Sequence, residues 1–181
     1  GQKPTSSHGA VDIKVFDYSL TVKSDKNYDL KTEDKKLRVN LSKFDLKVLN
    51  LDYDRWEKDY FKIEEECESG FYRWLEFYAL DAFNKDFPYH IHVFLDFVYR
   101  YGHDEEASLK NISCELVEEF FADFLLRKVM VEPDEYPEWF PAVKLFYEYL
   151  RDIGYIDDIS KITDILNEQE PEFIELLKNK Y

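Results

Sequence analysis

Cysteine, glycine and proline are scarce in this sequence, and long apolar runs are absent. The 181 residues include two Cys, five Gly and six Pro, which leaves little room for long flexible segments. Cys67 and Cys114 form no C-x-x-C motif, so we expect reduced thiols and a cytoplasmic location, with a single disulfide between them as the alternative. Because no run of about 18 apolar residues is present, we expect neither a membrane span nor a membrane partner.

The sequence also lacks the short motifs that accompany common catalytic and binding sites. It contains no P-loop, no G-x-G-x-x-G, no G-x-S-x-G and no H-E-x-x-H. His90 and His92 stand two residues apart, a spacing that directs helical side chains to different sides, so we do not expect them to share a metal. Adjacent carboxylates such as Glu118 and Glu119 are typical of a solvated face. The sequence therefore predicts no catalytic residue, no cofactor and no metal site.

Aromatic and acidic residues, by contrast, are abundant. Aromatic side chains make up 18% of the chain and hydrophobic residues 45%, which predicts a single folded domain with a large core. The net charge of −15 is unevenly distributed. Residues 1–51 carry ten Lys/Arg against seven Asp/Glu, a net charge of +3, whereas residues 52–181 carry fourteen against thirty-two, a net charge of −18. This asymmetry predicts an acidic body with a mildly basic N-terminal part.

The N-terminal part shows the alternation of a β-structure. Residues 1–10 are polar and aperiodic, and they predict a disordered arm or a remnant of expression. Residues 11–22 and 37–51 each alternate apolar and polar positions, with one change of phase. We therefore expect an antiparallel pair of β-strands over 11–51, joined by the charged stretch 23–36.

From residue 52 onward the apolar residues recur with a helical period. The predicted helices cover 54–66, 71–85, 88–101, 114–131, 138–153, 160–167 and 171–180. Their expected boundaries are Gly70 as a break between the first two, Pro88 and Pro171 in first turns, Ser113 as an N-cap, and Gly102 and Gly154 at C-termini. The expected fold is α+β and mainly α: an acidic domain over 52–181, built as a bundle of five to seven helices, with the strand pair packed on it or extending from it.

Residues 89–156 resemble the helical core-binding, SAM-like domain of tyrosine recombinases and phage integrases. The matching residues are Phe94-Leu95-Asp96-Phe97, Leu109, Ile112-Ser113, Val117-Glu118-Glu119-Phe120, Leu125-Leu126-Arg127, the run Ala142 to Leu150, and Gly154-Tyr155-Ile156. The resemblance implies a compact helical bundle. It does not extend to the family's basic DNA-binding face, because residues 88–156 carry six Lys/Arg against fourteen Asp/Glu, and no H-x-x-R motif of the catalytic domain is present.

Five aromatic residues lie at the edges of the helical stripes and form the predicted interaction surface: Trp56, Tyr60, Tyr72, Trp139 and Tyr149. Our first hypothesis is accordingly a non-enzymatic protein-interaction module that binds a protein partner or forms a homo-oligomer. The second is a nucleic-acid-related accessory protein, which either binds DNA through the basic segment 23–47 or mimics DNA with its acidic body. Direct contact between the acidic body and nucleic acid is disfavoured by phosphate repulsion. The third is an enzyme whose carboxylates and histidines match no known motif.

Overall fold

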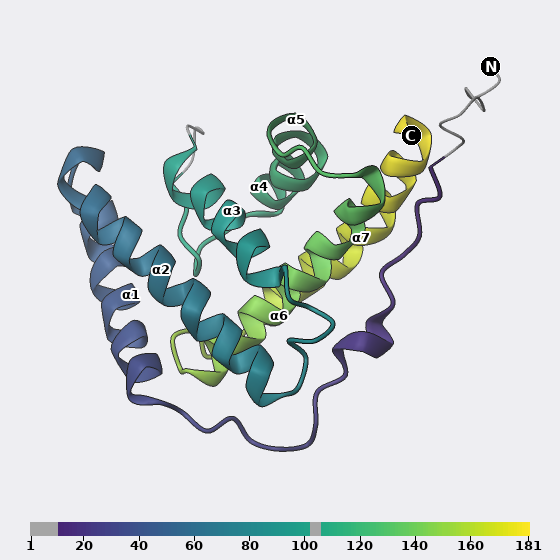
Figure 1. Cartoon of the computed structure of the whole chain (residues 1–181). Coiled ribbons are helices and arrows are strands. Elements are labelled where there is room, and N and C mark those ends of the chain that lie inside the picture. The colour runs from purple at the N-terminus through teal and green to yellow at the C-terminus, as the bar shows by residue number, and fades with distance from the viewer. Residues whose placement is uncertain (1–10, 102–105) are drawn as a thin grey trace.

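The computed structural model describes residues 11–101 and 106–181, and over these residues the protein is all-α, with six helical rods (Figure 1). The rods are α1 (Thr32–Asn50), α2 (Tyr53–Phe77), α3 (Phe87–Arg100), a rod made of α4 (Cys114–Glu119), a π-helical turn (Phe120–Phe124) and α5 (Leu125–Lys128), then α6 (Trp139–Asp152) and α7 (Ser160–Lys180). Short 3₁₀ turns cover Tyr18–Thr21 and Pro133–Glu138. The expected arm at 1–10 and the expected helix end at Gly102 lie outside the described residues.

The predicted strand pair over 11–51 is wrong, and with it the α+β class. Residues 11–31 form an extended segment interrupted by one 3₁₀ turn, and 37–51 belong almost entirely to α1. The reason is visible in the buried positions of α1. Leu37, Leu41 and Phe44 recur at helical spacing and are buried, while the residues that completed the alternation, Val39 and Leu46, are exposed. A short apolar segment can satisfy both periods, and packing against α2 selects the helical one.

Two predicted helix breaks are also absent. Gly70 lies inside α2, which runs without interruption for 25 residues, and Pro171 lies inside α7, so that the two short helices expected over 160–180 are one. Gly70 is buried against the ring of Tyr149 in α6, where a Cβ would overlap the phenol oxygen. The glycine therefore permits two helices to approach closely instead of ending one of them.

Other boundary signals act as expected. Pro88 stands in the first turn of α3, and the Ser113 hydroxyl accepts a hydrogen bond from the Leu116 amide at 3.0 Å at the start of α4. Gly154 follows α6 with a φ of 82°, in the left-handed region that glycine adopts at little cost. These signals act through local geometry, which explains why they could be identified without the fold.

The core is built largely from aromatic rings. The π-helical turn inserts Phe120 between α3 and α6, where it meets Phe94 at 5.2 Å, and Phe121 stacks on Phe140 at 3.6 Å between ring centroids. The N-terminal segment 11–31 runs past α7 and beneath α2 and α6 to reach α1 (Figure 1). Along this path the Tyr18 hydroxyl donates to Glu170 at 2.7 Å, and the Lys23 ammonium lies 5.1 Å from the Trp74 ring centre. The segment is therefore packed on the helices without forming a sheet.

A buried carboxylate connects this segment to the bundle. Asp34, in the first turn of α1, is fully buried and accepts hydrogen bonds from the hydroxyls of Tyr28 at 2.6 Å and Tyr149 at 2.8 Å and from the Lys31 amide at 3.0 Å. Arg73 of α2 adds a cation at 3.7 Å. One side chain thus fixes the start of α1 relative to α2, α6 and the N-terminal segment.

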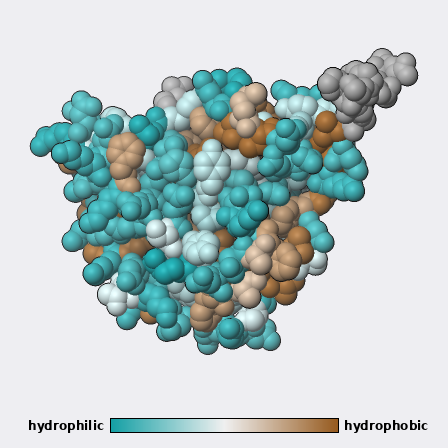
Figure 2. Space-filling model, in the orientation of Figure 1, coloured by the Kyte–Doolittle hydropathy of each residue, from teal (hydrophilic) through white to brown (hydrophobic). Residues whose placement is uncertain are grey.

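The outer surface is dominated by polar residues. On the face shown in Figure 2, hydrophilic residues predominate and hydrophobic residues form separate patches between them. Among the helices of 11–101 and 106–181, none has an apolar stretch long enough to cross a bilayer.

The close contact between Gly70 and Tyr149 predicts an unusual effect of a helix-favouring substitution. Gly70→Ala should destabilise the protein by about 1–3 kcal/mol, because the buried, hydrogen-bonded Tyr149 ring must shift to admit the methyl group. Urea denaturation followed by circular dichroism measures the change. The matched control is Ser69→Ala at the exposed neighbouring position of α2. An increase in stability, as helix propensity alone predicts, would contradict the packing described.

Candidate functional site

Four of the five aromatic residues expected on an interaction surface lie in the core. Trp56, Tyr60, Trp139 and Tyr149 are buried, whereas Tyr72 is 44% exposed. Trp56, for example, packs edge-on against Phe44 of α1 at 5.6 Å. Residues at the edge of an apolar stripe stay exposed when a helix packs on a single neighbour. Helix α2, which carries Trp56 and Tyr60, contacts α1, α3 and α6, so these edge residues are covered. Of the five predicted residues, Tyr72 alone is therefore accessible to a partner.

Exposed aliphatic residues are found instead on the outer face of α1. This helix lies at the edge of the molecule and packs mainly on α2 (Figure 1). Its free face presents Val39, which is 47% exposed, and Leu46, which is 63% exposed, two turns further along the same side. Leu49 is exposed as well.

A groove runs beside these residues, between α1 and residues 154–157, and we call it the α1 groove. It has a volume of about 430 Å³, and Val39, Leu46 and the Tyr155 ring supply its apolar wall. The cations Arg38, Lys43 and Lys110 also line it, against a single carboxylate from Asp157.

Two contacts give the α1 groove its shape. The Tyr155 hydroxyl donates to Asp45 of α1 at 2.7 Å, and the Lys110 ammonium lies 4.5 Å from the centre of the Tyr155 ring. Gly154 brings the chain so close to α1 that a Cβ there would lie 3.3 Å from a guanidinium nitrogen of Arg38. The groove is therefore a fixed, basic and partly apolar surface on an otherwise acidic protein.

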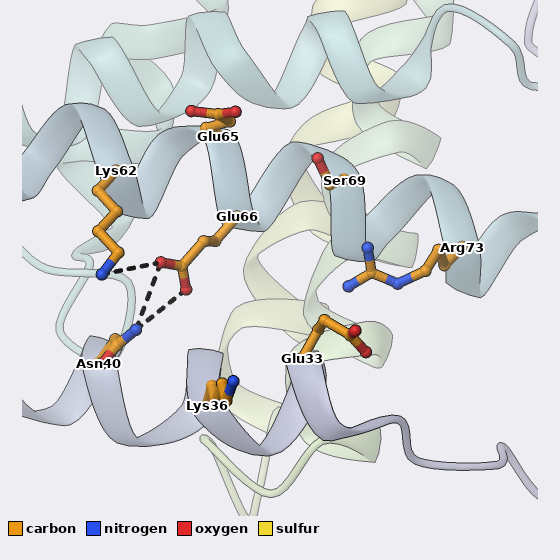
Figure 3. A pocket seen from close by; sticks show the side chains of 8 residues that line it. All are labelled: Glu33, Lys36, Asn40, Lys62, Glu65, Glu66, Ser69 and Arg73. Atoms are coloured by element: carbon orange, nitrogen blue, oxygen red, sulfur yellow. Dashed lines mark hydrogen bonds and ion pairs between the residues drawn. The ribbon is translucent and has the colours of Figure 1, made fainter.

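A second cavity, of about 350 Å³, separates α1 from α2 (Figure 3). Its charged lining consists of three cations and three carboxylates: Lys36, Lys62, Arg73, Glu33, Glu65 and Glu66. Glu66 already accepts from the Asn40 side chain at 3.1 Å and lies 4.0 Å from Lys62. Because opposite charges balance within the cavity, it favours neither an anionic nor a cationic ligand.

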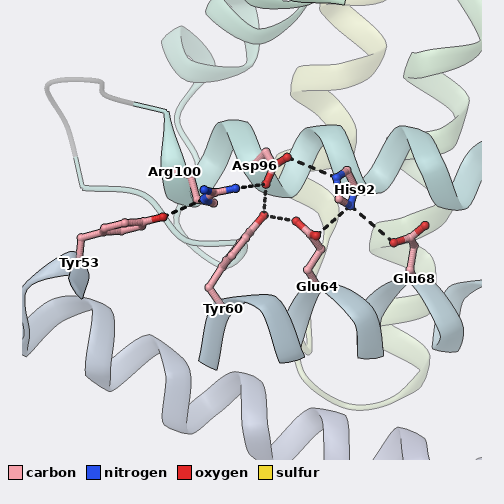
Figure 4. Close-up of polar contacts among 7 residues, drawn as sticks. All are labelled: Tyr53, Tyr60, Glu64, Glu68, His92, Asp96 and Arg100. Atoms are coloured by element: carbon pink, nitrogen blue, oxygen red, sulfur yellow. Dashed lines mark hydrogen bonds and ion pairs between the residues drawn. The ribbon is translucent and has the colours of Figure 1, made fainter. Parts of the chain in front are cut away.

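A third arrangement is a polar cluster between α2 and α3, which we call the α2–α3 cluster: Tyr60, Glu64, His92 and Asp96 (Figure 4). The Tyr60 hydroxyl lies 2.5 Å from Glu64 Oε2 and 2.6 Å from Asp96 Oδ1. His92 Nδ1 lies 2.9 Å from Glu64 Oε1, and His92 Nε2 lies 3.5 Å from Asp96 Oδ2. One hydroxyl proton and one imidazole thus stand between two carboxylates.

The electrostatics of the α2–α3 cluster follow from burial. The pKa of the Glu64 carboxyl is raised to about 7, chiefly by burial and also by the facing Asp96 carboxyl, against the opposing effects of the hydrogen bond from Tyr60 and the charge of His92. Burial, followed by hydrogen bonding to Asp96 and Glu64, raises the pKa of Tyr60 far above its usual range. Two more charged side chains border the cluster: Glu68 lies 3.6 Å from His92, and Arg100 lies 3.5 Å from Asp96.

This cluster was not predicted from the sequence, although the sequence contains a signal for it. Glu64 and Glu68 are four residues apart on α2, and His92 and Asp96 are four apart on α3, so each pair shares one helix face. Nothing in the sequence indicates that the two faces meet. As expected from their spacing, His90 and His92 point to different environments: the His90 ring is buried and stacks on Trp139 at 4.0 Å.

Comparison of the chain with protein-family models, with curated proteins and with solved structures found no match. The resemblance of residues 89–156 to the core-binding domain of tyrosine recombinases therefore stays a prediction.

The two cysteines differ in a way that predicts their reactivity. Both are free thiols; Cys67 is buried in α2, where burial and the neighbouring carboxylates raise its pKa, and Cys114 is exposed at the start of α4. A thiol-reactive chromogenic disulfide should therefore modify one thiol rapidly in the native protein and two in denaturant. Cys114→Ser should abolish the rapid reaction. Equal rates for both thiols in the native wild-type protein would contradict the placement of Cys67.

Proposed function

We propose that this protein is a non-enzymatic protein-interaction module whose α1 groove binds an acidic amphipathic helix of a partner protein. The observation that carries the proposal is the composition of the groove. On a chain of net charge −15, it combines three cations with exposed Val39 and Leu46.

The charge distribution supports an acidic partner. Residues 31–50 contain six Lys/Arg against three Asp/Glu, and two of these carboxylates are already engaged: Asp34 is buried, and Asp45 accepts from Tyr155. The rest of the molecule repels an acidic partner, so the electrostatic field of the protein directs such a partner toward α1. Complementary charges of this kind raise the association rate and set the orientation of the partner, and they contribute less to the affinity.

The apolar residues favour an amphipathic helix in particular. Val39 and Leu46 are two helical turns apart, which matches the spacing of apolar side chains along one face of a partner helix. Burying two or three aliphatic side chains contributes on the order of 1.5–3 kcal/mol each before the cost of association. We therefore expect weak binding, with a dissociation constant on the order of micromolar to millimolar.

Nucleic acid is a poorer match to the same groove. Phosphates gain nothing from the exposed aliphatic groups of Val39 and Leu46, and the net charge of the protein opposes their approach. The two free thiols support the further proposal that the protein works in a reducing compartment such as the cytoplasm.

A synthetic peptide can test the proposed function directly. The probe is a fluorescent 20-residue helical peptide with leucine on one face and glutamate on the other, and fluorescence anisotropy measures its binding to the full chain. Leu46→Glu should weaken binding at least 10-fold, because it removes an apolar contact and adds repulsion. Met130→Glu is the control, since Met130 is also an exposed apolar residue and lies outside α1.

Four further measurements complete the test. A peptide with lysine in place of glutamate should not bind, and added salt should weaken binding of the acidic peptide. Equal binding of the acidic peptide to wild type and Leu46→Glu contradicts the proposal. Tighter binding of a duplex DNA fragment, or self-association in sedimentation that Leu46→Glu abolishes, would assign the groove to nucleic acid or to a second copy of the chain.

A further inference from the structure

We propose that the α2–α3 cluster is a divalent metal site in which Glu64, His92 and Asp96 bind Zn²⁺. One potential ligand atom from each of the three residues lies within 4.8 Å of the other two. The site is separate from the α1 groove, since it is formed between α2 and α3 (Figure 4).

Tyr60 positions the two carboxylates for this role. It holds Glu64 by Oε2 and Asp96 by Oδ1, and the other oxygen of each carboxylate, Oε1 and Oδ2, lies nearest to His92. Arg100 also contacts Asp96 through Oδ1, at 3.5 Å. Hydrogen bonds from neighbouring groups to the second oxygen of a ligand are what orient carboxylates in metal sites.

The three ligand atoms lie close enough for a small cation once the side chains move slightly toward one another. Ligand atoms of a tetrahedral Zn²⁺ lie about 3.2–3.5 Å apart, as its bond lengths of about 2.0–2.2 Å require. His92 Nδ1 lies 2.9 Å from Glu64 Oε1 and His92 Nε2 lies 3.5 Å from Asp96 Oδ2, so the two contacts use different nitrogens of the ring, and a set of one ligand atom from each residue lies within 4.8 Å. A turn of the imidazole ring that directs one nitrogen between the two carboxylates completes the set of three ligands.

Accessibility and rigidity also favour a site. All three ligands are on long helices, which place side chains more accurately than loops do. The Glu64 side chain is buried, while the side chains of His92 and Asp96 are 36% and 30% exposed, so an ion can reach the cluster from solvent. The fourth position falls to water or to Glu68, whose Oε2 lies 3.6 Å from His92 Nδ1.

The ligand types select the metal. Mg²⁺ and Ca²⁺ prefer all-oxygen sites with six or more ligands, whereas one imidazole with two or three carboxylates in a site of low coordination number suits Zn²⁺. We therefore expect Zn²⁺ to bind with a micromolar or lower dissociation constant and Mg²⁺ to bind at least 100-fold more weakly.

Isothermal titration of the purified full chain with Zn²⁺ tests the site, with Mg²⁺ titrated for comparison. His92→Gln and Asp96→Asn should each weaken Zn²⁺ binding at least 10-fold, and Tyr60→Phe should weaken it by about 10-fold because the carboxylates lose their orientation. Asp123→Asn is the matched control: Asp123 is also paired at i, i+4 on a helix, with Arg127, but lies outside the cluster. Circular dichroism confirms that each variant is folded.

Binding of Co²⁺ gives a second, spectroscopic readout, which reports metal coordination directly. A four-coordinate Co²⁺ site shows strong visible absorption, which His92→Gln should abolish while Asp123→Asn preserves it. If wild type binds no Zn²⁺ below millimolar concentration, the cluster is a metal-free ion-pair network and the proposal fails. It fails equally if His92→Gln binds Zn²⁺ as tightly as wild type, since the metal then occupies another surface site.

Discussion

The position of α1 depends on the buried carboxylate of Asp34. A charged group removed from water is stable only when donors surround it, and here two tyrosine hydroxyls, a backbone amide and a nearby guanidinium do so. The donors come from the N-terminal segment, α6 and α2, so their convergence fixes the first turn of α1. Phe44, almost three turns later, fixes the rest by packing on Trp56. The α1 groove exists because this helix is held at the edge of the bundle with one face free.

The aromatic core and the acidic surface have complementary roles. The rings of Phe120, Phe121 and Trp139 fill the centre and hold the helices in place, and the remaining helix faces can then carry a large excess of carboxylates. Charge is unevenly distributed in two places. The α1 groove is basic, and the α2–α3 cluster concentrates acidic groups around one histidine. The groove lies between α1 and residues 154–157, and the cluster lies between α2 and α3.

Local signals could be interpreted from sequence and long-range ones could not. Pro88, Ser113 and Gly154 act on the backbone within one turn, and the structure confirms each. Gly70 and Pro171 were interpreted by the same local rules, but both lie inside continuous helices. At Gly70 the missing side chain leaves room for Tyr149 of α6, so the glycine serves helix packing and does not end α2. Trp56, Tyr60, Trp139 and Tyr149 look like surface residues only if the neighbours of their helices are unknown.

The sequence by itself determined the helical body over residues 52–181, most helix positions within it and the uneven distribution of charge, because periodicity, capping residues and formal charge are properties of the chain alone. Only the tertiary structure decided the conformation of residues 11–51, since Leu37, Val39 and Leu41 fit a strand as well as a helix until α2 covers one face. Only the tertiary structure brought His92 and Asp96 to Glu64, because two i, i+4 pairs become one cluster when their helices pack face to face.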